Sequence, residues 1–83
     1  MKRILDENMA VNITGSQIKK FRRRAGLSQR QLSEKLELEA VYTCRGSISR
    51  IENGQRAVTD IELYAIAKVL SVSVNELFDN KTP

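Results

Sequence analysis

The fold is decided by residues 26–54, GLSQRQLSEKLELEAVYTCRGSISRIENG, which hold two short helical patterns in close succession. In the first, Ser28 is followed three residues later by Gln31, a capping box that marks the start of a helix. Two leucines four residues apart supply a buried stripe, so the pattern predicts a helix over about 29–37. Helices shorter than about 12–15 residues are marginal alone in water, so other helices must support this one.

The second pattern comes after residues 38–43, which have no helical stripe and should form a loop packed by its own apolar groups. A helix then begins at about Arg45, turns Ile48 and Ile51 inward, and ends at Asn53-Gly54. That pair suits the left-handed turn that ends many helices. The sequence therefore predicts two short neighbouring helices joined by a loop.

Three more capping boxes predict three supporting helices. They pair Thr14 with Gln17, Thr59 with Glu62, and Ser73 with Glu76. The first helix should span about 16–25, the second about 60–70, and the last is a short helix near the C-terminus. The stripes expected in the core are Ile18, Phe21 and Ala25 in the first helix, and Leu63, Ile66, Ala67 and Leu70 in the second.

Length and composition indicate one compact all-α domain of five helices. A chain of 83 residues supplies apolar material for one core. One proline, four glycines and no sustained two-residue alternation argue against strands. We expect residues 13–79 to form the domain, with 1–12 as a flexible N-terminal arm and 80–83 as a C-terminal tail.

Residue types also exclude several functions. With a single cysteine, Cys44, and no histidine, the sequence offers no internal disulfide, no plausible zinc site or other cofactor, and no pairing of general base with nucleophile, so we expect no enzyme. No apolar run approaches the roughly 20 residues that cross a bilayer, and Asp6 and Glu7 stand where a secretory signal would be apolar. A cytoplasmic location is expected.

Charge is unevenly distributed along the chain. Residues 19–56 contain ten basic and four acidic side chains, whereas residues 57–83 contain two basic and four acidic ones. Positive potential in the first of these regions would attract phosphate. From charge alone, a surface that faces nucleic acid and an ordinary solvated face explain the pattern equally well.

The helix that begins at Arg45 has an outer face suited to DNA. If Ile48 and Ile51 point inward, the helical period turns the following residues outward: Arg45, Gly46, Ser47, Ser49 and Arg50. Arginine can make a bidentate contact with guanine, serine can donate to or accept from several bases, and glycine lets the backbone come close. This face is what a major groove would meet.

At this point the sequence resembles a known family. The segments Gly26-Leu27-Ser28-Gln29, Leu32-Ser33-Glu34-Lys35-Leu36 and Ser47-Ile48-Ser49-Arg50-Ile51-Glu52-Asn53-Gly54 look like the signature of the lambda-repressor-like family, the Cro, phage-repressor or XRE-type helix-turn-helix proteins. The resemblance extends from Thr14 to Phe78. It implies sequence-specific binding of double-stranded DNA by a transcriptional regulator, most simply a repressor, that reads the major groove with its third helix.

The resemblance also implies roles for single residues. The base-facing positions would be Arg45, Gly46, Ser47, Ser49 and Arg50. Those near DNA phosphates would be Gln29, at a helix N-terminus, and Asn53, Gln55 and Arg56, just after the recognition helix. Arg22 and Glu52 match a structural ion pair. Similar proteins often bind palindromic operators as homodimers, and we expect Val74 and Phe78 to serve either the core or, as we favour, a surface shared by two copies.

One departure from the family concerns the turn between the two short helices. Members usually have about seven residues from the last leucine to the first buried isoleucine, whereas Leu36 and Ile48 are twelve apart here. The five extra residues, within about 37–42, put the usual tight turn and the approach angle of the next helix in doubt, and could add a DNA contact from Tyr42 or Arg45. Cys44 stands where serine or threonine commonly caps the helix, so the cap should be weak or move to Thr43.

Two alternative functions remain open at the level of sequence. The first is an antitoxin or controller protein that regulates its own operon and holds a partner protein. The second is a protein-interaction module that uses the fold without DNA. Dependence on salt separates them, because phosphate contacts weaken steeply as salt rises and apolar contacts do not.

Overall fold

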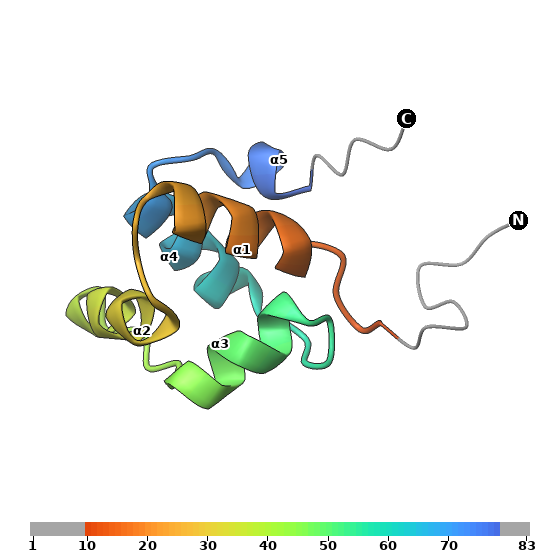
Figure 1. Cartoon of the computed structure of the whole chain (residues 1–83), viewed down its shortest axis with the longest axis horizontal. Helices are drawn as coiled ribbons and strands as arrows, with labels where there is room; N and C mark the ends of the chain where they lie inside the picture. Colours follow the sequence, from red (N-terminus) through yellow and green to blue (C-terminus); the bar gives the residue numbers. More distant parts are fainter. Residues whose placement is uncertain (1–9, 79–83) are drawn as a thin grey trace, which may run out of the picture.

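A computed structural model describes residues 10–78. They form five helices: α1 (Gly15–Arg24), α2 (Gln29–Leu38), α3 (Arg45–Glu52), α4 (Asp60–Leu70) and α5 (Val74–Leu77). Figure 1 shows α1 and α4 in the middle of the molecule, α3 along its lower edge and α5 along its upper edge. The described part of the chain contains no strand, so the all-α prediction is confirmed.

The predicted N-terminal arm and C-terminal tail lie mostly outside the described residues. The arm over 1–12 and the tail over 80–83 lie outside the described residues, apart from 10–12. Among those three, the Val11 N–H donates to the Gly54 carbonyl at 2.8 Å, and Asn12 Nδ2 donates to the Ile51 and Arg56 carbonyls at 3.0 and 2.8 Å. Residues 11 and 12 are therefore bonded to the end of α3 and the loop after it.

The core is built from one apolar stripe per helix, as predicted. Its completely buried members are Ile18 of α1, Leu32 and Leu36 of α2, Ile48 and Ile51 of α3, Ile66 of α4 and Leu77 of α5. Ala25 is a correction, because it is exposed and lies after the last residue of α1. Gly26 turns the chain at a φ of +75°, and Leu27 packs against the core instead. None of the helices among residues 10–78 is long and apolar enough to cross a membrane.

Three of the four predicted capping boxes are present, at the starts of α2, α4 and α5. The fourth is wrong, because the Thr14 side chain makes no capping bond. Asn12 takes its place, with its side-chain oxygen accepting the N–H groups of Thr14 and Gly15 at 3.0 and 2.8 Å. Gly15 starts the helix directly against the end of α3, where a Cβ would collide with the Ile51 carbonyl oxygen.

The longer connection between α2 and α3 is accommodated by two local features. First, α2 continues to Leu38 and ends in a turn with Ala40 at a φ of +61°, which lets the Val41 N–H donate to the Leu36 carbonyl at 3.0 Å. Second, Val41 packs against the core. Cys44 is the residue that precedes α3, and its side chain makes no capping bond, so the expectation of a weak cap is confirmed.

Candidate nucleic-acid interface

The outward face of α3 carries the residues predicted to meet DNA bases. Ile48 and Ile51 are 1% and 0% exposed, so they fix the helix on the body of the domain. Arg45, Gly46 and Arg50 are exposed, and Ser47 and Ser49 are half-buried. A short helix held by two buried isoleucines is a rigid support, and its arginines can reach a partner without disturbing the core.

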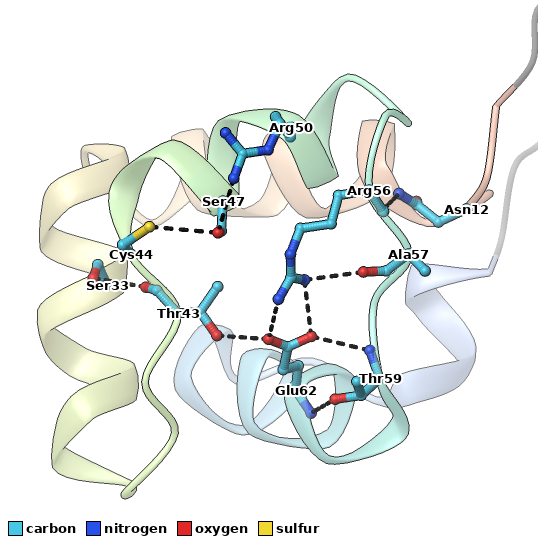
Figure 2. Close-up of polar contacts among 10 residues, drawn as sticks. All are labelled: Asn12, Ser33, Thr43, Cys44, Ser47, Arg50, Arg56, Ala57, Thr59 and Glu62. Carbon is cyan, nitrogen blue, oxygen red and sulfur yellow. Dashed lines mark hydrogen bonds and ion pairs between the residues drawn. The ribbon is translucent and has the colours of Figure 1, made fainter.

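Among residues 10–78, polar contacts on this face are few and local. Arg50 Nη2 donates to Ser47 Oγ at 3.3 Å, and Ser47 Oγ also lies 3.4 Å from Cys44 Sγ (Figure 2). Hydrogen bonding with Ser47 lowers the pKa of the exposed Cys44 thiol. The Arg50 guanidinium has five N–H groups and uses one of them in its bond to Ser47, so most of its donors remain available to a partner.

A polar groove separates the starts of α2 and α3. It has a volume of about 530 Å³ and is lined by Ser28, Gln29, Arg30 and Arg45. The N-terminus of α2 brings unpaired backbone N–H groups to one wall, and two arginines bring positive charge. Such a groove suits a phosphate.

Beneath α3, a buried ion pair joins three helices. Arg22 Nε of α1 donates to Glu52 Oε2 at 2.6 Å and Arg22 Nη2 donates to Glu52 Oε1 at 3.0 Å. Arg22 Nη1 also donates to the Leu27 carbonyl at 2.7 Å, and Gln29 Nε2 of α2 donates to Glu52 Oε1 at 3.0 Å. Gln29, predicted to lie near a phosphate, thus has its side-chain nitrogen turned inward, while its backbone remains at the start of α2 beside the groove.

After α3, the three residues predicted to lie near phosphates have different surroundings. Asn53 and Gln55 are exposed, and the Gln55 N–H donates to the Arg50 carbonyl at 2.8 Å across a turn with Gly54 at a φ of +76°. Arg56 is half-buried, and its guanidinium lies against Glu62 of α4, with both nitrogen–oxygen distances 3.0 Å (Figure 2). The pKa of Arg56 is raised by its hydrogen bonds to Glu62.

Glu62 is a site residue that the sequence did not indicate beyond its place in a capping box. Its carboxylate accepts from Arg56, from the Thr59 N–H at 3.0 Å and from Thr43 Oγ1 at 2.9 Å. The Arg56 guanidinium holds the pKa of this carboxyl at about 2, well below its usual range. Nothing in the spacing of Thr43, Arg56 and Glu62 could have predicted that they meet, because the loops decide it.

Comparison with known proteins identifies this arrangement. Residues 18–77 match the helix-turn-helix family. A relative from Mycoplasma sp., the control protein C.MunI, is 33% identical over 67 residues, which cover 80% of this chain and 84% of the relative. The crystal structure of the restriction-modification controller protein C.AhdI from Aeromonas hydrophila superposes with a TM-score of 0.68 at 28% identity, over 78% of this chain and 87% of that one.

The family match runs from within α1 to the end of α5, and it includes the pair α2 and α3 described above. The five-residue enlargement of the turn does not change the fold. The chain belongs to the lambda-repressor-like helix-turn-helix family of DNA-binding transcriptional regulators.

Proposed function

We propose that this protein represses transcription in the cytoplasm by occupying an operator, and that α3 reads the operator in the major groove. The observation that carries the proposal is the rigid, outward-facing α3, with Ile48 and Ile51 completely buried and Arg45 and Arg50 exposed. The base-facing residues are Arg45, Gly46, Ser47, Ser49 and Arg50. Gln29, Asn53 and Gln55 contact phosphates on either side.

Selection of bound fragments from random DNA tests this proposal. A consensus sequence is expected, with affinity that falls about a thousandfold between 50 and 200 mM salt if six phosphates are contacted. If no DNA fragment is enriched, and the protein instead binds a protein partner with an affinity that is insensitive to salt, it is a protein-interaction module.

Single variants then separate base reading from phosphate binding. Arg50→Ala should relax the preference at one position of the consensus by about 1–3 kcal/mol, whereas Gln55→Ala should weaken all sequences alike. The matched control is Arg23→Ala, which removes an exposed arginine from α1. Equal effects of Arg50→Ala and Arg23→Ala on base preference would contradict the role of α3.

We further propose that the protein binds a palindromic operator as a homodimer. A groove of about 390 Å³ is lined by apolar side chains from both ends of the described chain, from the loop before α4 and from α4, namely Val11, Ile13, Val58, Leu63 and Phe78. Val11, Ile13 and Phe78 are large apolar residues left exposed in one copy. A symmetric pair would place two α3 helices on half-sites about 34 Å apart.

Analytical ultracentrifugation at micromolar concentration tests the dimer. Phe78→Ser should shift the wild-type dimer towards monomer, whereas Leu38→Ser, which replaces an equally apolar and more exposed residue outside the groove, should not. A monomer both free and on selected DNA would refute the dimer.

The second candidate function is a controller that regulates its own operon. It is favoured by the similarity to two proteins named as controllers, C.MunI and C.AhdI. Footprinting on the DNA upstream of its own gene tests this role. Protection of this upstream DNA by the protein alone supports a controller. Protection only at unrelated promoters supports a general repressor.

A further inference from the structure

One carboxylate of α4 is bonded to the segments on both sides of α3. Glu62 Oε2 accepts from Thr43 Oγ1 at 2.9 Å, and Thr43 directly precedes Cys44, the N-cap of α3. Both carboxylate oxygens accept from Arg56 at 3.0 Å, and Arg56 lies four residues beyond the end of α3. Figure 2 shows the Thr43 hydroxyl and the Arg56 guanidinium both directed at the Glu62 carboxylate, from two different directions.

These contacts continue into the rest of the domain. The Thr43 carbonyl accepts from Ser33 Oγ of α2 at 2.8 Å. The Arg56 carbonyl accepts from Asn12 Nδ2 at 2.8 Å, and the same nitrogen donates to the carbonyl of Ile51 in α3 at 3.0 Å. Glu62 is thus the central member of a network that runs from α2, past both ends of α3, to the start of α1.

The helix that this network surrounds needs outside support at its N-terminus. α3 has eight residues, its first turn lacks a side-chain cap, and the connection from α2 is five residues longer than the family's usual turn. A longer connection fixes the position of the next helix less tightly, because more backbone angles can vary. Thr43 as a residue is 3% exposed, so the bond from its hydroxyl to Glu62 is shielded from competing water.

We propose that Glu62 is the positioning residue for base recognition: it clamps the two segments that flank α3 and so sets the angle at which Arg45 and Arg50 enter the groove. In this arrangement Arg56 is the counter-ion of the clamp and not a phosphate ligand. Three of its N–H donors are already used, two by Glu62 and one by the Ala57 carbonyl at 2.9 Å. This role of Glu62 rests on the proposed DNA-binding function, because Glu62 acts by orienting the helix that reads DNA.

The test compares variants of the full chain that remove one contact each. Glu62→Gln removes the charge and keeps the size, Thr43→Val removes the hydroxyl, and Thr43→Ser retains it. Glu76→Gln is the matched control, because Glu76 closes the same kind of capping box in α5 without touching either flank of α3. Circular dichroism first sets a temperature at which all variants are folded.

Affinity is measured for the DNA fragment that the wild type selects and for a scrambled fragment. Glu62→Gln and Thr43→Val should each lose about tenfold in affinity for the selected fragment, the scale of one mismatched base pair, with less than threefold change on scrambled DNA. Thr43→Ser and Glu76→Gln should bind both fragments like the wild type. Equal losses on both fragments, or no loss, would overturn the clamp.

The role of Arg56 is read from salt dependence. Arg56→Gln should weaken binding to the selected fragment while leaving the slope of log Kd against log salt unchanged. A lost phosphate contact would instead lower that slope by about 0.9. A slope reduced in this way would return Arg56 to the phosphate-binding residues, against the proposal.

A measurement on the free protein keeps the clamp separate from DNA binding. In Glu62→Gln, amide hydrogen exchange should accelerate about tenfold or more in the first turn of α3, and change less than twofold in α1. Should the wild type select no DNA, the proposed function fails, and this exchange pattern alone then decides whether Glu62 holds α3. Unchanged exchange in α3 overturns the clamp whatever the DNA results.

Discussion

Two buried carboxylates hold α3, one from within the helix and one from a neighbouring helix. Glu52 belongs to α3 itself and pairs with Arg22 of α1, with side chains 1% and 8% exposed. Glu62 belongs to α4 and pairs with Arg56 in a loop, with side chains 10% and 32% exposed. The first pair is sealed within the packed helices, so it decides whether α3 stays on the domain. The second pair is more exposed to water and connects the two segments that flank α3, so it sets the orientation of α3.

The largest expected effect comes from breaking the sealed pair. Glu52→Gln leaves the Arg22 guanidinium buried without a counter-charge, which should lower the free energy of unfolding by about 3–5 kcal/mol. Urea unfolding followed by circular dichroism measures it. The double variant Arg22→Met with Glu52→Leu should recover much of the loss, because apolar side chains of similar size remove both charges together.

A loss below about 1 kcal/mol in Glu52→Gln would contradict the comparison, since an exposed pair contributes about that much. It would mean that the buried isoleucines alone fix α3. In that case the two carboxylates would differ only in location.

The second prediction uses pH to distinguish the looser pair. The Arg56 guanidinium lowers the pKa of Glu62 from 4.5 to about 2 in the folded protein. The unfolded state therefore binds a proton more readily, so this contribution is complete above about pH 4.5 and is lost as the pH falls towards 2. It should be on the order of 2 kcal/mol, less than the whole shift implies, because Arg56 is partly hydrated.

Urea unfolding between pH 2 and 7 measures this contribution. Glu62→Gln should lose less stability than the wild type over the acid range, because its amide does not titrate. The control Glu76→Gln keeps the Glu62 pair and should fall with pH as steeply as the wild type. If Glu62→Gln also falls as steeply, the pair is not what titrates.

Sequence predicted what neighbouring residues determine and missed what loops bring together. The capping boxes at Ser28, Thr59 and Ser73 were right because donor and acceptor lie three residues apart on one turn. Thr14 had the same pattern and failed, since Asn12 was better placed to accept the N–H groups at the start of α1. A local pattern cannot show such competition.

In the DNA-binding site, too, features fixed by neighbouring residues were predicted and contacts made through loops were missed. Periodicity was enough to place Arg45 and Arg50 on the outer face of α3, because burying two isoleucines settles which side faces out. The contact of Arg56 with Glu62 depends on the path of residues 53–59, which no periodicity describes. Sequence alone therefore predicted a phosphate role for Arg56, and only the folded chain shows the carboxylate beside it.

The third prediction strengthens the uncapped start of α3. In Cys44→Ser, the new hydroxyl can accept a backbone N–H of the first turn, which should raise the free energy of unfolding by about 1 kcal/mol. The double variant Cys44→Ser with Thr43→Val should then lose less affinity for selected DNA than Thr43→Val alone, because the new cap compensates in part for the lost contact with Glu62. Thermal unfolding and DNA binding measure the two effects, and simple additivity would show that cap and clamp act independently.

The smallest effect concerns Ala40, whose φ of +61° strains an L-residue in the segment that leads to Thr43. Ala40→Gly relieves that strain but makes the unfolded chain more flexible, so stability should rise by only about 0.5 kcal/mol. Gly26→Ala, at a φ of +75° in open space, is the mirror control and should lose a similar amount. If the clamp aims α3, Ala40→Gly leaves the affinity for selected DNA unchanged despite its looser loop, whereas a loss would show that loop stiffness, and not Glu62, sets the angle of the helix.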